Sequence, residues 1–244
     1  MLRRFLVLED HQYTALTLWI LHTFVFQDFQ HTPRLALLSP TRGCGKSVVL
    51  NLCLRLCLRA RKFGLTSTAS LPRLIDSNQP TLLLDEADNI DFAHEPVLRS
   101  ILNDGFEEGG VRAIVVKEEP RAFNLFTPVA FGAIGRLPLP LMSRAVVINM
   151  RRAPRNAKIE RFDVKNPTLV DELGVVYRYT FDWAREVRGK LNTDPAMPDG
   201  FHGRVADRWR ALFSIADALV TATRPVKRRR SLPARIRTKT SRSR

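Results

Sequence analysis

The sequence of 244 residues contains few cysteines, and they are not placed to form a disulfide framework. The three are Cys44, Cys53 and Cys57, which lie close together in the chain. A set this small and clustered is typical of a reducing compartment, so we expect a cytoplasmic location. Cys53 and Cys57 would share one face of a helix, but no histidine lies nearby to complete a metal site. We therefore expect buried core cysteines rather than metal ligands.

Long apolar runs are also missing. The run at residues 13–26 contains His22 and falls short of the ~20 residues that a bilayer-spanning helix requires. It also lacks a signal-peptide cleavage pattern at the right distance from the N-terminus. We expect a buried core helix at this place and no targeting segment.

Glycine is scarce, at 12 residues, proline is not in excess, at 15, and 45% of the chain is hydrophobic. This composition predicts a globular chain that is long enough for one sizeable core and a small second unit.

Acidic residues are absent from residues 224–244, which contain ten Lys or Arg, whereas the rest of the chain has 29 basic and 24 acidic residues. Such a segment cannot bury a core, and we assign residues 222–244 to a disordered basic tail. A solvated polycation can neutralise phosphates, which makes a nucleic acid, most simply DNA, the expected partner. The abrupt change after Leu219 leaves two origins open: a tail selected for nucleic-acid binding, or a shifted reading frame.

A candidate phosphate-binding loop follows the apolar run at residues 34–38. The run leads into Gly43, Cys44, Gly45, Lys46 and Ser47, and a second apolar run begins directly afterwards. A strand, a glycine-containing loop ending in Gly-Lys-Ser, and a helix together are typical of a nucleotide site. In such a loop the backbone N–H groups face the phosphates, the lysine reaches the β- and γ-phosphates, and the serine hydroxyl ligates Mg²⁺.

One position of this loop departs from the usual pattern, because Pro40 replaces its first glycine. Proline has no N–H and a fixed φ, which weakens the match. The alternative is a glycine turn that happens to precede Lys-Ser, but the flanking strand and helix favour the nucleotide site.

A second motif lies at residues 81–86, where a short apolar strand ends at Asp85 and Glu86. In a Walker B element the aspartate holds Mg²⁺ and the glutamate orients and polarises the attacking water. The alternative is a strand that leads into an acidic turn. The string Asp-Glu-Ala-Asp also suggests a DEAD-box helicase, but those proteins have a longer spacing between the motifs and a second motor domain that this chain cannot hold.

A third candidate is Arg144, at a loop-to-strand junction where a side chain could project towards the nucleotide of a neighbouring subunit as an arginine finger. The alternative is an ordinary surface arginine. The remaining pattern predicts either a short strand or an ordered lead-in at residues 2–7. It predicts strands at residues 66–70, 81–84, 111–116, 129–133 and 145–150, and helices at residues 11–29, 46–62, 71–76, 96–103, 168–190 and 204–219.

These motifs, with the strings at residues 134–138 and 143–144 and the run at residues 204–217, resemble an uncharacterised family of P-loop ATPases from phages, plasmids and actinobacteria. Its members are often attached to primase-like modules and are similar to superfamily 3 and AAA+ ATPases. The resemblance covers residues 1–219 and implies ATP and Mg²⁺ binding, helicase-like activity, a homo-oligomeric ring and a primase-type partner. This chain has Ser143-Arg144 where the family has Asp-Arg, and it lacks a polar sensor residue after residues 129–133.

We therefore expect an α/β fold: a three-layer P-loop NTPase core of the AAA+ and superfamily 3 type at residues 1–152, a C-terminal helical lid subdomain at residues 153–221, and the basic tail. The expected function is ATP hydrolysis coupled to DNA remodelling or unwinding in mobile-element replication. Two alternatives stay open: an ATP-dependent DNA-binding switch or loader without unwinding, and a degenerate fragment.

Overall fold

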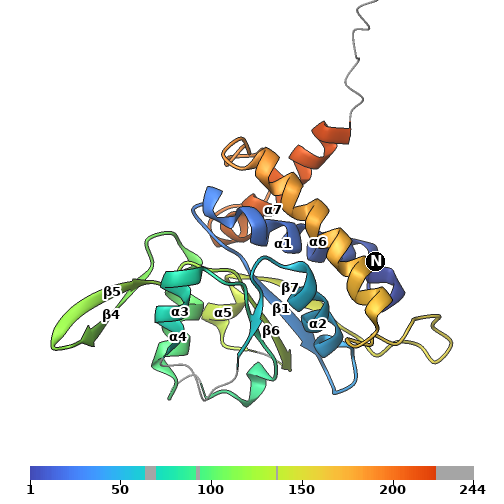
Figure 1. Cartoon of the computed structure of the whole chain (residues 1–244), viewed down its shortest axis with the longest axis horizontal. Coiled ribbons are helices and arrows are strands. Elements are labelled where there is room, and N and C mark those ends of the chain that lie inside the picture. The colour runs from blue at the N-terminus through green and yellow to red at the C-terminus, as the bar shows by residue number, and fades with distance from the viewer. Residues whose placement is uncertain (64–69, 92–93, 136, 224–244) are drawn as a thin grey trace, which may run out of the picture.

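The fold is built around a parallel β-sheet (Figure 1). The computed structural model describes residues 1–63, 70–91, 94–135 and 137–223. Within these residues the sheet has five strands in the order β2-β3-β6-β1-β7, and every pairing is parallel. The strands are β1 (Arg34–Ser39), β2 (Arg61–Lys62), β3 (Leu82–Leu84), β6 (Val129–Ile134) and β7 (Ala145–Asn149).

Helices cover both faces of this sheet and give three layers. In β1, Leu35 and Leu37 point into one hydrophobic core, while Ala36 and Leu38 point into the other. A strand that is apolar on both faces is what a sheet between two helical layers requires, because successive side chains alternate between the faces. The predicted α/β class and its layered arrangement are confirmed.

The helices divide between the two cores. Side chains from α1 (Asp10–Val25), α2 (Lys46–Leu56), α6 (Pro167–Val187) and α7 (Arg204–Thr223) belong to the first core. Those from α3 (Leu71–Asn78), α4 (Pro96–Asn103) and α5 (Leu139–Met142) belong to the second. Four short 3₁₀ helices complete the described helical elements: η1 (Leu2–Arg4), η2 (Phe26–Asp28), η4 (Ala87–Asn89) and η5 (Asp104–Phe106).

A separate two-stranded sheet, formed by the segment between α4 and β6 in the chain, projects from the body (Figure 1). Strands β4 (Val111–Val116) and β5 (Glu119–Asn124) pair antiparallel. The turn between them places Lys117 and Glu118 at positive φ, as a two-residue hairpin turn demands. The strand predicted at residues 111–116 is confirmed, but it belongs to this hairpin rather than to the central sheet.

Several predicted boundaries are wrong. Of the two alternatives for residues 2–7, the structure has the ordered lead-in, which forms η1, and not the strand. The helix predicted at residues 46–62 ends at Leu56. The second strand of the sheet is Arg61–Lys62. The strand predicted at residues 66–70 falls almost wholly outside the described residues, and its last residue, Ser70, is the N-cap of α3.

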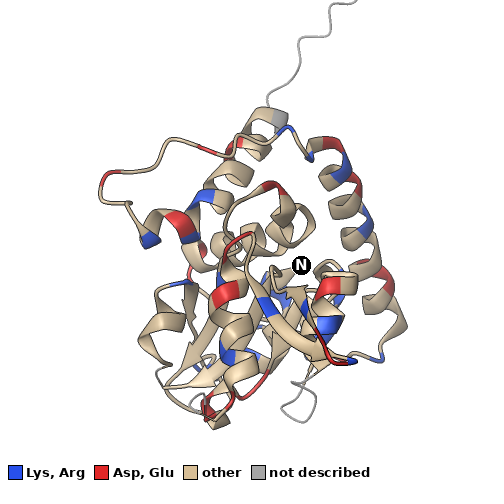
Figure 2. Cartoon of the chain, turned by 90° about the vertical axis from the view of Figure 1, so that its left-hand side faces the viewer, with Lys and Arg blue, Asp and Glu red and all other residues tan. Residues whose placement is uncertain are grey.

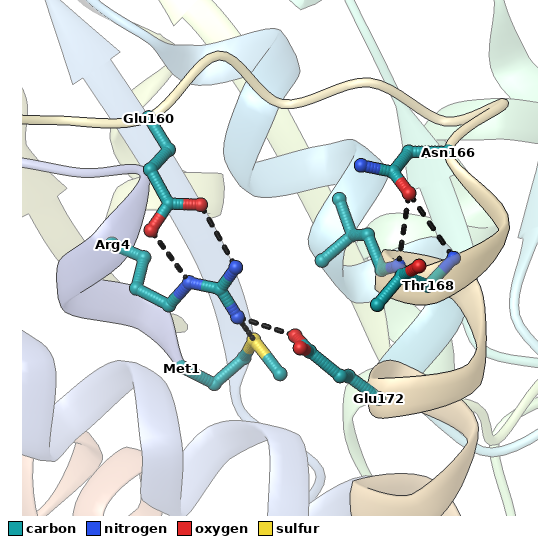
Figure 3. A network of polar contacts seen from close by, with 7 residues as sticks. Met1, Arg4, Glu160, Asn166, Thr168 and Glu172 are labelled. Atoms are coloured by element: carbon teal, nitrogen blue, oxygen red, sulfur yellow. Dashed lines mark hydrogen bonds and ion pairs between the residues drawn. The ribbon is translucent and has the colours of Figure 1, made fainter.

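The N-terminus is tied to α6 through Arg4 (Figure 3). Its guanidinium donates to both carboxylate oxygens of Glu160, at 2.9 and 2.8 Å, and also bonds Glu172 on α6. These partners hold the pKa of Arg4 above its usual value and that of Glu160 below it. Beside them, the Asn166 side chain accepts from the backbone N–H groups of Thr168 and Leu169 and caps α6. Helix α6 is therefore tied to η1 by charge near its N-terminal end, and it packs onto the first core through its apolar side chains.

Arg34, at the start of β1, is fully buried and binds backbone oxygens. It donates to the carbonyls of Ile101 and Leu102 in the last turn of α4, at 2.8 and 3.1 Å, and to that of Thr127 at 2.6 Å. Burial lowers its pKa to about 9, so the guanidinium stays charged at neutral pH. A cation here satisfies the unpaired carbonyls of the helix end and fixes α4 against the sheet.

Charges of both signs are interspersed along the helices (Figure 2). None of the described helices is both long enough and apolar enough to cross a membrane. The basic tail predicted at residues 222–244 lies outside the described residues from Arg224 onward.

Candidate functional site

The two predicted motifs meet at a reversal in the order of the strands. Strands β1 and β6 are neighbours, but the helices that follow them, α2 and α5, pack on opposite faces of the sheet. In such sheets, ligands bind in the crevice outside the carboxyl ends of the strands at this point. A cavity of about 470 Å³ lies there, within the range of small-molecule sites. It is lined by Arg42, Gly43, Cys44, Gly45, Lys46, Ser47, Val48, Asp85, Glu86, Asp88, Asn89 and Ile134.

The loop before α2 turns on two glycines. Gly43 and Gly45 have φ of 77° and 87°, a region that other residues adopt only at a cost. Gly45 is the N-cap of α2, so the unpaired N–H groups of the helix start face the cavity. The Cys44 side chain is buried, with its Sγ 3.7 Å from Thr41 Oγ1, so this residue can offer the cavity its backbone rather than its thiol. The loop therefore presents backbone donors suited to an anion.

Lys46 is held at the floor of the site by a residue whose role the sequence did not indicate. Its Nζ donates to Ser39 Oγ at 2.6 Å, and the Ser39 hydroxyl donates to the Thr41 carbonyl at 2.8 Å. Both side chains are buried. Ser39 thus orients the lysine from the end of β1, while Ser47, next along α2, lines the cavity itself.

Asp85 and Glu86 follow directly after β3, as predicted. Asp85 Oδ1 accepts from the Glu86 N–H at 3.1 Å, and Glu86 has φ of 56°, in the left-handed region. Non-glycine residues rarely adopt this conformation, and it is concentrated at functional sites. The turn carries the Glu86 side chain to the cavity, where it is exposed.

Gly132 allows the two motifs to approach each other across β6. Strand β6 separates β1 from β3, and an added Cβ at Gly132 would lie 3.3 Å from Asp85 Oδ1 and 3.5 Å from Lys46 Cβ. No motif in the sequence includes this residue. An isolated glycine inside an apolar strand, which often marks a close approach, is the signal that could have found it.

Arg152 is a second residue that the sequence did not single out. It lies just beyond β7, and its guanidinium donates to the Arg42 carbonyl at 3.4 Å. An added Cβ at Gly43 would lie 3.3 Å from Arg152 Nη2. Arg152 therefore brings a positive charge against the outside of the glycine loop, and it also lines an adjoining cavity of about 400 Å³.

Arg144 lies at the opposite end of the strands from the cavity, where β1 and β7 begin. It directly precedes β7, whose first residue pairs with Arg34 at the start of β1, whereas the glycine loop follows the end of β1. The six residues of β1, at ~3.3 Å each, separate its start from the glycine loop by roughly 20 Å, a distance that an arginine side chain cannot span. The structure does not bring Arg144 into the cavity of its own chain.

Charged groups of both signs lie near Arg144. Its guanidinium donates to the Pro140 carbonyl at 2.8 Å, and Arg204 of α7 donates to Ser143 Oγ at 3.1 Å. Burial and the nearby Arg204 lower the pKa of Arg144, against the opposing effect of Asp104 and Glu107. Its position at a loop-to-strand junction is as predicted.

The C-terminal helices do not cover the cavity. No residue of α6 or α7 lines it, and both helices share the first core with α1 and α2. The apolar residues of these helices pack onto the first core, and the helical lid subdomain expected at residues 153–221 stays a prediction.

The cysteines are placed as the sequence suggested. Cys53 and Cys57 are free thiols buried in the first core. Burial raises the pKa of Cys57, which makes its thiol unreactive. Within the described part of the chain, no group of three or more His, Cys, Asp or Glu side chains could hold a metal ion.

No protein-family model matches the chain, and no curated protein matches its sequence.

Proposed function

We propose that this chain is a P-loop ATPase of the AAA+ and superfamily 3 type that hydrolyses ATP and couples hydrolysis to DNA remodelling or unwinding. One observation carries the proposal: two motifs 39 residues apart meet around one cavity at the carboxyl ends of non-adjacent strands. The carboxyl ends of parallel strands lie on one side of a sheet, and the residues that meet there are those that phosphate and Mg²⁺ binding require. The resemblance described above adds the setting of mobile-element replication and a primase-type partner.

The residues divide the chemistry between them. The N–H groups of residues 43–47 and the Lys46 ammonium bind the phosphates. The Ser47 hydroxyl and the Asp85 carboxylate are hard oxygen donors of the kind that Mg²⁺ prefers, and both line the cavity. Bound Mg²⁺ supplies positive charge that offsets the charge developing on the phosphates. Glu86, exposed at the mouth of the cavity, accepts the proton of the attacking water.

The experiment that tests this function compares Lys46→Ala with Glu86→Gln. Lys46→Ala should weaken MgATP binding, because its ammonium meets the phosphates in the ground state. Glu86→Gln should leave binding intact and lower turnover by roughly 10²–10⁴-fold, the usual contribution of a general base. Binding is measured by titration with a non-hydrolysable ATP analogue, and turnover by phosphate release. Equal turnover by the wild type and Glu86→Gln would refute the assignment.

The nucleic-acid part of the proposal rests on charge and concerns residues 224–244. Removing this tail should weaken DNA binding and flatten its salt dependence while leaving basal ATPase activity unchanged. Losing four phosphate contacts would change the slope of log K against log salt by roughly 3 to 4 on duplex DNA. Binding is measured over a range of salt concentrations, and DNA stimulation of ATPase at physiological salt. A changed slope with unchanged stimulation would make the tail an adventitious binder.

A second candidate function is a nucleotide-dependent switch or loader that binds ATP and DNA without unwinding. It is favoured by the end of β6, where Ala133 and Ile134 offer no polar side chain to the cavity. A motor should show DNA-stimulated turnover and strand separation, whereas a switch should show nucleotide-dependent DNA binding alone. Turnover with and without single-stranded DNA, measured beside an unwinding assay, decides between them.

A further inference from the structure

The turn that follows Glu86 is tied to the end of β6 by a carboxylate. Helix η4 begins one residue after Glu86, and within it Asp88 Oδ1 accepts from the Ile134 N–H at 2.9 Å. The same turn buries Ala87 in the second core. The segment carrying Glu86 is thus fixed on one side by apolar packing and on the other by a charged hydrogen bond to the neighbouring strand.

The last residue of this turn reaches back to the proposed base. Asn89 Nδ2 donates to Glu86 Oε2 at 3.2 Å. Because Asn89 and Asp88 are adjacent in one short 3₁₀ turn, the position of the Glu86 carboxylate depends on where Asp88 places that turn. Both residues line the cavity.

The next backbone N–H in the chain, that of Gly135 directly after β6, contacts the residue that holds Lys46. Gly135 N donates to the Ser39 carbonyl at 3.0 Å, and Ser39 Oγ accepts from Lys46. Two consecutive N–H groups at the end of β6 therefore connect the segment carrying Glu86 with the residue that holds Lys46. These contacts use the backbone, so they do not need a polar side chain at this strand end.

We propose that Asp88 is a positioning residue. Its hydrogen bond with the Ile134 N–H fixes the turn, so that Asn89 can hold Glu86 in place. Asp88 thereby takes the role of the polar sensor side chain that β6 lacks. The inference rests on the proposed ATPase function. It assigns a role to the final aspartate of the Asp-Glu-Ala-Asp string that differs from a DEAD-box reading. It also joins both halves of the site to one strand end.

The test uses four single variants of the full chain and the double variant Asp88→Ala/Asn89→Ala. Asp88→Ala removes the acceptor of the Ile134 N–H, and Asp88→Asn keeps an oxygen at the same place. Asn89→Ala removes the contact to Glu86. The control is Asp91→Ala, which deletes a carboxylate two residues after Asn89. Its Oδ2 lies 2.8 Å from His94 Nδ1.

Asp88→Ala and Asn89→Ala should each lower kcat by about tenfold or more, because small displacements of a catalytic group are costly, with affinity for the ATP analogue unchanged. The double variant should lose little beyond either single one, since both changes act through one turn. Asp88→Asn should restore most of the turnover. Amide exchange at Ile134 should speed up in Asp88→Ala and stay slow in Asp88→Asn and Asp91→Ala.

The outcomes separate this inference from the function on which it rests. A wild type that turns over no ATP refutes the ATPase function and, with it, any positioning role of Asp88. An active wild type with unchanged kcat in Asp88→Ala overturns the inference alone. So does an equal loss of kcat and analogue binding, or a failure of Asp88→Asn to recover turnover, because each points to a general disturbance of the site.

Discussion

Gly132 is the residue on which the approach of the two motifs depends. A side chain at this position would lie in tight contact with Asp85 Oδ1 and in ordinary contact with Lys46 Cβ and Leu50 Cδ1. Because β6 is fully buried here, backbone shifts are costly and the Asp85 carboxylate has to move instead.

We expect Gly132→Ala to weaken MgATP binding by roughly tenfold, about 1.4 kcal/mol, because it displaces a Mg²⁺ ligand. Binding is measured by titration at fixed Mg²⁺, and raising Mg²⁺ should recover part of the loss. The matched control is Gly174→Ala in α6, where the added Cβ meets only the Arg178 side chain at 3.6 Å. That change should raise helix stability by roughly 0.5–1 kcal/mol and leave binding intact. Unchanged binding in Gly132→Ala would show that the Asp85 carboxylate has room to adjust.

His22 predicts a dependence of stability on pH. It is fully buried, neither ring nitrogen has a hydrogen-bond partner among the described residues, and its ring lies 6.4 and 6.2 Å from those of Phe26 and Phe29. Burial, helped by the positive charge of Arg34, lowers its pKa to about 3. Below its unfolded pKa of about 6.5, the unfolded chain binds a proton that the folded chain refuses, so stability falls as pH falls.

Between pH 7 and pH 5 this single group should cost about 2 kcal/mol of unfolding free energy. His22→Leu removes the titrating group, so its stability should change less over the same interval than that of the wild type. Urea denaturation at the two pH values measures the difference, and the carboxylates common to both proteins cancel in the comparison. Equal pH dependence of the two proteins would mean that His22 gains a proton without unfolding.

At the scale of single residues, the sequence identified those whose chemistry is specific to a motif. Lys46, Ser47, Asp85 and Glu86 all line the predicted cavity. It did not assign roles to Ser39, Asp88, Asn89, Gly132 and Arg152, which act through hydrogen bonds or space fixed only by the tertiary fold. Apart from the contact of Asn89 with Glu86 three residues away, these contacts join segments that only the fold brings together. Of these residues, Gly132 alone has a local signal, as an isolated glycine inside an apolar strand.

Among the elements, the end of α2 shows where a periodic pattern misleads. Asn51, Arg55, Arg59 and Lys62 fit one helical stripe, but the helix stops at Leu56, where Cys57 becomes extended and Arg59 takes φ of 47°. The chain has to turn there to reach β2. Asn51 and Lys62 still meet, through a side-chain hydrogen bond of 2.6 Å, so the two polar residues share a surface without sharing a helix.

The hairpin between α4 and β6 shows a different limit. The apolar content of residues 111–116 was enough to predict a strand, but β5 is mostly exposed and contains Pro120 and charged residues, so it gives no strand signal. The turn also lacks the Asn-Gly pair that usually marks such hairpins. Strand identity was therefore predictable, whereas the partner strand and the separate sheet were not.

For the whole molecule, the position of Arg144 bears on assembly. Arg144 and Arg204 lie near the amino-terminal ends of β1 and β7, roughly 20 Å from the glycine loop of the same chain. An arginine there can take part in hydrolysis only at the site of another subunit. Repeated head-to-tail contact of this kind closes into a ring when its rotation permits.

We expect Arg144→Ala to lower turnover strongly without lowering ATP affinity, since an arginine finger acts on charge that develops in the transition state. Mixing Arg144→Ala with Glu86→Gln should restore part of the activity, because one of the mixed interfaces joins an intact Glu86 to an intact Arg144. The control is Arg178→Ala, an exposed arginine on α6, which should be as active as the wild type. Particle mass measured with the ATP analogue gives the assembly independently. A monomer under these conditions, or no recovery at any mixing ratio, would leave Arg144 as a surface residue that braces α5 through Pro140.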